Sequence, residues 1–383
     1  MSTNDPGPLV RLWGLRTEQL PATAAPPAAL EPFLFAILRE AIPFVDSAAP
    51  KQSGGVPDSK MWKRKGSHAH PDSAAKVEVL ERVVPVGELE KVAAEGGGGG
   101  KGKGERKGKL RPETWCCRRS VHEDKPAKGS ASWEEFVRSF RDEHAASERA
   151  FTPACMDAHQ ALAWDCGDVQ TGEEEEDEEE GGRMWGRFGL VVQEMRHRIG
   201  RPVLKDRTFP VLQMTASAIS DSSEDGDDGR GFGSTDEFIV VSIPVPDFGT
   251  AESSKLAKEK GAQIASYVSV ERIRRIRDGD GDGSGSGSGS GKIEWLMATA
   301  SDAGGVLPAW VQNAAAPGVI WKDVPLFLRW IARERVKKQG GSEVGGGGKG
   351  ETAPNATEGV RADDVTAVSD GVNHTEAAAP GNP

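Results

Sequence analysis

The stretch ATASDAGGVLPAWVQN, residues 298–313, decides how the rest of the sequence is interpreted. An apolar, strand-like run at 293–300 ends here, and Gly304 and Gly305 let the backbone turn sharply. Pro308 suits the first turn of a helix, where its missing N–H costs nothing. Apolar residues at helical spacing then continue to about residue 338, with a break or kink expected at Pro317. A helix that begins directly after the last strand is expected to cover the sheet.

The composition indicates one domain carrying polar insertions. The chain has 383 residues and 48 glycines, and many of these glycines lie in runs without apolar patterning. Such segments predict disorder, and inserted loops cost a single fold little free energy. We expect an N-terminal helical part at 1–47, a mostly disordered linker at 48–110, a domain at 111–338 with disordered insertions at 172–182, 221–234 and 278–291, and a disordered tail at 339–383.

Between these segments, the residue patterns predict an α+β fold. A helix is expected at 30–42, and the capping box formed by Ser132 and Glu135 begins another that runs to about residue 149. The Gly-Ser repeat between Ile276 and Ile293 occupies the position of a hairpin turn. Strands are expected at 115–121, 161–164, 185–192, 208–216, 238–245, 265–276 and 293–300. The predicted architecture is a strongly curved antiparallel sheet with one long C-terminal helix across its concave face.

Charge and cysteine usage favour a soluble, cytoplasmic protein. The net charge of −11 owes much to the acidic run at 173–180, which mainly stays solvated. The four cysteines form no CxxC pair and the first residues are polar, so we expect a reducing compartment. The basic run at 101–111 is interpreted as a solubilising linker, with transient contact to an anionic membrane surface as the alternative. No aromatic residues interleave with it, so nucleic-acid binding is not expected.

Motifs for metals, cofactors and catalysis are incomplete. The run beginning at Asp278 starts like a calcium loop but has Gly289 where the bidentate Glu belongs. His68 and His70 lack a third metal ligand nearby, and the glycine-rich run at 97–104 lacks the Ser or Thr of a phosphate loop. We therefore expect no metal, no cofactor and no enzymatic activity. A catalytic pair of Cys or Ser with His that meets only in the folded chain stays open.

The expected strands mix large apolar side chains with single polar ones. Gln213 shares a strand face with Phe209 and Val211, and Trp295 shares one with Met297. Such faces are typical of a cavity lining, because a buried polar group needs a partner. The alternatives are that Gln213 bonds to a neighbouring backbone group and that Trp295 belongs to the core.

Asp302, Gly305, Pro308, Trp310 and Asn313 form a D-x-x-G-x-x-P-x-W-x-x-N pattern. This pattern resembles the passage that enters the C-terminal helix of START lipid-transfer domains. The chain is more similar to a largely fungal START-like family, domain of unknown function 3074, over about residues 9–338. The similarity is carried by ETWCCRRSVHED (113–124), SWEEF (132–136), DRTFPVL (206–212), SYVSVERIR (266–274) and the long run 297–330, besides RLWGL and FLFAILREAIPFVDS near the N-terminus.

The resemblance implies a helix-grip fold with a tunnel between sheet and helix that holds a lipid or another hydrophobic molecule without covalent chemistry. Arg118, Arg207 and Glu271 are candidates for a charged pair that meets a polar headgroup. We expect a monomer; the alternatives are an enzyme of the same fold, cyclase- or hydrolase-like, and an interaction scaffold with a closed cavity. The expected ligand contacts are Gln213, Trp295, Met297, Trp310, Asn313, Phe327 and Trp330, with hinges at Gly304, Gly305 and Pro317.

Overall fold

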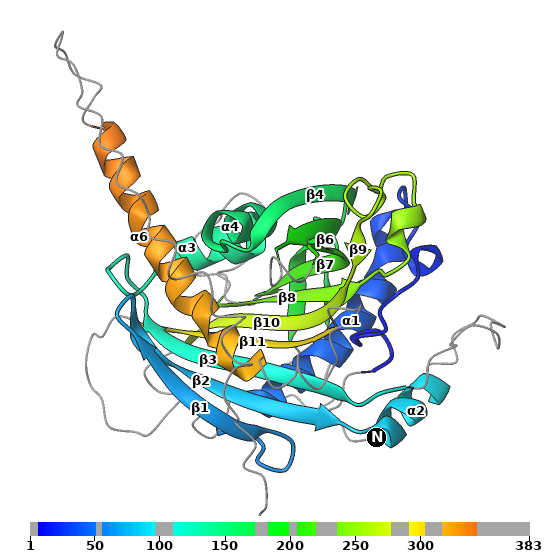
Figure 1. Cartoon of the computed structure of the whole chain (residues 1–383), viewed down its shortest axis with the longest axis horizontal. Coiled ribbons are helices and arrows are strands. Elements are labelled where there is room, and N and C mark those ends of the chain that lie inside the picture. The colour runs from blue at the N-terminus through cyan, green and yellow to red at the C-terminus, as the bar shows by residue number, and fades with distance from the viewer. Residues whose placement is uncertain are drawn as a thin grey trace, which may run out of the picture.

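A single large, curved sheet dominates the structure, a computed structural model (Figure 1). The residues it describes are 7–50, 56–95, 110–172, 183–198, 205–219, 236–276, 291–302 and 316–342. The strand order is β1-β2-β3-β11-β10-β8-β7-β6-β4; β5 pairs with β6, and β9 pairs with β7 as the sole parallel pair among the strands described. The strands are β1 (Lys63–His70), β2 (Ser73–Val84), β3 (Glu113–Glu123), β4 (Cys155–Trp164), β5 (Thr171–Gly172), β6 (Met184–His197), β7 (Arg207–Ile219), β8 (Glu237–Pro244), β9 (Gln263–Ile264), β10 (Ser266–Ile276) and β11 (Lys292–Asp302).

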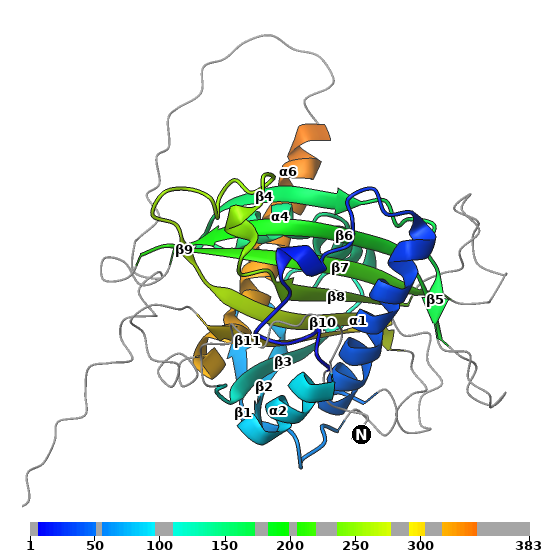
Figure 2. The same ribbon diagram turned by 90° about the vertical axis from the view of Figure 1, so that its right-hand side faces the viewer.

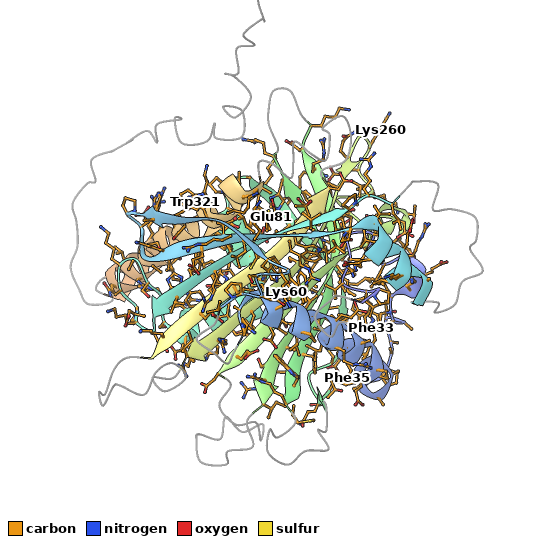
Figure 3. All side chains as sticks on the ribbon, turned by 90° about the horizontal axis from the view of Figure 1, so that it is seen from below. Phe33, Phe35, Lys60, Glu81, Lys260 and Trp321 are labelled. Atoms are coloured by element: carbon orange, nitrogen blue, oxygen red, sulfur yellow. The ribbon has the colours of Figure 1, made fainter. Side chains whose placement is uncertain are left out.

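Helices cover both faces of this sheet. Figures 1 and 2 show α1 on one face and α6 on the other. In Figure 3, Trp321 lies at the opposite side of the sheet from Phe33 and Phe35 of α1. The helical segments are η1 (Thr17–Gln19), α1 (Pro27–Ala48), α2 (Val86–Glu95), α3 (Trp133–Phe136), the π-helical η3 (Val137–Asp142), α4 (His144–Phe151), η4 (Phe248–Thr250), η5 (Ile320–Lys322) and α6 (Asp323–Ser342).

Strand alternation divides the side chains between two cores. On β11, Leu296 and Ala298 join the core beneath α1, whereas Trp295 joins a cluster beneath α6. Arg272, 1% exposed, donates to the buried carboxylate of Glu294 at 3.1 Å and also to Asp46 of α1. This buried ion pair joins α1 to the sheet, so the α1 face is closed by the protein itself.

The expected architecture is confirmed. Each predicted strand overlaps an observed one, and the sheet has a C-terminal helix across one face. Ile276 pairs with Lys292 in the antiparallel β10–β11 ladder, so the Gly-Ser repeat connects a hairpin as expected. Residues 277–290 themselves lie outside the described residues.

The expected linker at 48–110 contains regular structure. Strands β1 and β2 and helix α2 all lie within it, and β2 pairs with β3 from Val77 to Val84. β1 is an edge strand with mostly exposed, polar side chains, so it lacks the apolar alternation that identifies a strand. The strand pattern in the sequence was weak because only β2 of this hairpin places side chains in the core.

One helix also differs from expectation. The helix expected from Ser132 is divided into α3, η3 and α4, although its capping box forms as predicted. At the C-terminus, residues 303–315 lie outside the described residues, and α6 begins at Asp323 after the single turn η5. In the described parts of the chain, no helix is both long and apolar enough to cross a membrane.

Candidate functional site

The sheet face beneath α6 is divided into two halves. We call the first the aromatic half, built around Trp295 of β11 and Phe327 of α6, both 0% exposed. Their ring centroids are 5.4 Å apart. Phe140 of η3 lies 4.7 Å from Trp295 and 4.8 Å from Phe327, and Phe136 lies 5.5 Å from Trp295. These edge-to-face and tilted contacts fill this half completely.

Local sequence explains why these aromatics meet. The side chain of Ser132 caps α3 by accepting a hydrogen bond from the Glu135 backbone N–H. In return, the Glu135 carboxylate accepts one from the Ser132 backbone N–H. Glu135 also receives two hydrogen bonds from Arg335 of α6. This contact holds the α3–η3 segment against α6 and brings Phe136 and Phe140 over the sheet.

The second half, which we call the polar half, has small and polar side chains on the same strands. Ser269 of β10 pairs with Ser242 on one side and Thr299 on the other, and Ser242 pairs with Gln213 of β7. We define the polar half by Gln213, Thr215, Ser242, Tyr267, Ser269, Met297 and Thr299.

The polar half is not fully covered by the described residues. Tyr267, Met297 and Thr299 are partly exposed, although they point to the same face as the fully buried Trp295. Gln213 is 6% exposed, and its side chain makes no hydrogen bond within the described residues. The short side chains of Ser242 and Ser269 are nevertheless buried, at 2% and 9% exposure, and the Tyr267 ring lies 5.6 Å from that of Phe209.

A charged cluster lies on the boundary between the two halves. Nη2 of Arg118 (β3) is 3.3 Å from Oε1 of Glu271 (β10), and its Nε is 3.8 Å from Oδ2 of Asp323. The guanidinium also stacks 4.0 Å from the Trp295 ring centre, and Trp295 Nε1 donates to Glu271 at 2.6 Å. Arg118 is 2% exposed, yet its Nε and Nη1 have no hydrogen-bond partner in the part of the chain described.

Asp323 stands at the start of α6 and faces this cluster. Burial raises the pKa of Asp323 to about 6, Arg118 opposes the rise, and Glu148 and Glu271 add to it. A carboxyl group in this position therefore has a pKa of about 6, chiefly because burial disfavours its charged form.

A second group of titratable side chains comes from α4 and the end of β6. Glu148 lies between His144, at 3.6 Å, and His197, at 3.8 Å. Burial alone would raise the pKa of Glu148, but the hydrogen bond with His144 and the charge of His197 lower it. The pKa of His144 is raised because Glu148 outweighs its burial, so these two form an ion pair.

The site lacks an activated thiol and a metal cluster. Burial raises the pKa of Cys155 and of Cys116 to about 12, so both remain protonated at neutral pH. Among the residues with described positions, no group of three His, Cys, Asp or Glu side chains is placed to hold a metal ion.

The predicted ligand contacts have different surroundings. Gln213 and Met297 belong to the polar half, and their contact with a ligand stays a prediction. Trp295 and Phe327 instead pack at the centre of the aromatic half, because the α3–η3 aromatics lie against them. Trp330 lies at the margin of that cluster, 6.1 Å from Phe327.

The remaining predicted contacts and hinges are Trp310, Asn313, Gly304 and Gly305, and all four lie outside the described residues. Pro317 precedes η5, where one 3₁₀ turn separates it from α6. A hinge at this position remains a prediction.

Of the three charged candidates, the structure pairs Arg118 with Glu271 and places Arg207 elsewhere. Arg207 begins β7 and donates to the Lys205 carbonyl. Asp323, Glu148 and His144 were missed, because only the folded chain brings α4 and α6 to β3 and β10. The one available signal was that Asp323 lies within the long 297–330 motif.

A curved antiparallel sheet with a C-terminal helix across one face defines the helix-grip class of fold. The chain belongs to the family described as protein of unknown function (DUF3074), whose model matches residues 115–331, more than half of its length. Among curated proteins, none matches this sequence.

Three solved human structures are also similar to this chain, with low sequence identities and TM-scores below 0.5. Human STARD10 is 13% identical with a TM-score of 0.39, covering 74% of this chain and 78% of that one. The human StarD13 (DLC2) lipid transfer and protein localization domain is 12% identical with a TM-score of 0.35, covering 70% and 88%. Human StAR-related lipid transfer protein 5 is 10% identical with a TM-score of 0.37, covering 74% and 89%.

Proposed function

We propose that this chain binds a lipid or another hydrophobic molecule, without covalent chemistry, between the polar half of the sheet and α6. The supporting observation is the contrast within one sheet face. Trp295 is fully enclosed, whereas Met297 and Thr299 on the same strand and face are partly exposed. Because all components come from one chain, a monomer suffices for binding.

The energetics favour an amphiphile over a purely apolar molecule. Burial of an alkyl chain contributes roughly 25 cal/mol per Å², from which the costs of association are subtracted. The unpartnered N–H groups of Arg118 need polar partners, since a buried, unpaired donor costs about 1–3 kcal/mol. A hydrogen-bonding group on the ligand would also reach Gln213 at the edge of the same face. A ligand with a polar end meets both needs.

One observation favours an enzyme as the second candidate. Asp323, with a pKa of about 6, lies close to Glu148 and Glu271, and a perturbed carboxyl group in an open site is a candidate acid or base. The described cysteines offer no thiolate, so such an enzyme would use water or a hydroxyl side chain as its nucleophile. Hydrolysis of a long-chain ester that disappears in Asp323→Asn would support this candidate.

Native mass spectrometry of protein purified from cells tests the proposal. We expect a bound species in the wild type and its loss in Ser269→Phe, which fills the polar half. Ser67→Phe, on the exposed edge strand β1, is the matched control and should retain the ligand. A second variant, Met297→Trp, should also lose it. The proposal fails if the wild type carries no ligand and binds no added dodecanol.

A further inference from the structure

The charged cluster at the boundary of the two halves contains one carboxylate more than it has cations. Arg118 pairs with Glu271 at 3.3 Å, and His144 pairs with Glu148 at 3.6 Å. Asp323 remains, and Nε of Arg118, at 3.8 Å, is the cationic atom that the described residues place beside it. The same guanidinium already pairs with Glu271 through Nη2. His197 also lies 3.8 Å from Glu148, but burial lowers its pKa. With His197 neutral and the other groups ionised, the cluster has one excess negative charge.

Arg118 does not satisfy Asp323. Their separation of 3.8 Å exceeds hydrogen-bond length, so the contact is an ion pair without a shared proton. Nε and Nη1 of Arg118 are buried without an acceptor in the described part of the chain. Among the residues described, Arg118 thus lacks an acceptor for two buried N–H groups, whereas Asp323, 35% exposed, lacks a close charged partner of its own.

The titration of Asp323 agrees with this geometry. Burial raises its pKa to about 6 in spite of Arg118, and the carboxylates of Glu148 and Glu271 increase the rise. These are the charged groups that face Asp323 from β3, β10 and α4. A cation placed beside Asp323 would oppose the same effects and keep the carboxylate ionised.

The charge excess argues against a purely acidic amphiphile. A fatty-acid carboxylate directed at Arg118 would also approach Glu271 and Asp323, and like charges repel strongly where water is largely excluded. A neutral alcohol would satisfy Arg118 as an acceptor but would leave Asp323 without a charged partner. An ammonium next to an oxygen supplies both missing interactions.

We propose that the ligand is an amphiphile whose polar end carries a protonated amine, which pairs with Asp323, and a neighbouring oxygen, which accepts from Arg118. This inference rests on the proposed function of the same site. It narrows the ligand class from hydrophobic molecules in general to amine-bearing amphiphiles.

Binding of dodecylamine, dodecanol and dodecanoate to the full chain tests the inference. These probes share one alkyl chain and differ only in the polar end. At neutral pH we expect the amine to bind about tenfold more tightly than the alcohol, equivalent to about 1.4 kcal/mol, and the carboxylate to bind most weakly. The amine preference should fall as the pH drops through about 6, where Asp323 becomes protonated.

The matched variants are Asp323→Asn and Asp142→Asn. Asp323→Asn should remove the amine preference and keep dodecanol binding, whereas Asp142, whose side chain is 47% exposed, should be neutral. Equal binding of the three probes, or a preference for the carboxylate, would overturn the inference and leave the proposed function standing. Absence of binding by all three would contradict the proposed function itself.

Discussion

The aromatic and polar halves lie on the same strands and on the same face of the sheet, yet one is fully buried beneath α6 and the other is partly exposed. Phe238, Ile273 and Trp295 form one row across β8, β10 and β11. Further along the same strands, a second row is formed by Ser242, Ser269 and Thr299. Side-chain size along each strand, rather than the fold, decides where the helix-grip architecture packs solidly and where it leaves space.

Truncation should affect the two halves very differently. Phe327→Ala removes the ring at the centre of the aromatic half and should lower the free energy of unfolding by about 3–5 kcal/mol. Met297→Ala, in the partly exposed polar half, should cost less than about 2 kcal/mol. Denaturant unfolding of both variants measures this difference, and equal losses would mean that the two halves are packed alike.

Enlarging a side chain should also destabilise the aromatic half more than the polar half. Val240→Phe, in the aromatic half at 2% exposure, should destabilise the protein by about 1–3 kcal/mol through overpacking. Ser269→Phe introduces the same ring into the polar half, where the proposed function requires space, and should then cost less than about 1 kcal/mol. A larger loss for Ser269→Phe in thermal unfolding would show that the polar half is already filled.

A pH-dependent difference is expected at the boundary of the halves. Folding raises the pKa of Asp323 from 3.8 to about 6, so the associated stability is present below 3.8 and is lost as pH rises through 6. Asp323→Asn lacks this loss. The Tm of the variant minus that of the wild type should therefore increase between acidic and neutral pH. A difference that stays constant or decreases would contradict the assignment of Asp323 to a buried, carboxylate-rich site.

The smallest effect is expected for the β10–β11 connection, because the ladder it joins is already complete at Ile276 and Lys292. Replacing residues 277–290 by a short Asn-Gly turn keeps the ladder from Ile276 and Lys292 onward. The free energy of unfolding should change by less than about 1–2 kcal/mol, since loop closure depends only weakly on length. Dodecanol binding should be unchanged, and its loss would assign a ligand role to this segment.

The sequence predicted the fold better than it predicted the site. The hairpin around the Gly-Ser repeat and the strands with apolar patterns were identified correctly, because their signals are local. β1 was missed because it is a polar edge strand. Trp295 was placed on the correct face, but the sequence could not show that Phe136 and Phe140 pack against it.

The charged cluster could also be predicted only in part from local sequence patterns. Arg118 and Glu271 were candidates because the resemblance to lipid-transfer domains implies a charged pair that meets a polar headgroup, and the structure pairs them. Asp323 and Glu148 come from helices whose position over the sheet depends on long-range contacts. No local pattern places them together, and so the excess carboxylate becomes visible only in the folded chain.

Methionine-methyl NMR measures the central claim most directly, since Met297 of β11 faces the polar half and Met214 of β7 faces the α1 core. The chain has seven methionines, and Met297→Leu assigns the relevant signal. On addition of dodecanol, we predict that the Met297 signal shifts and that of Met214 does not. Binding of dodecanol with no shift of Met297, or with a shift of Met214 instead, would contradict a ligand site between the polar half and α6.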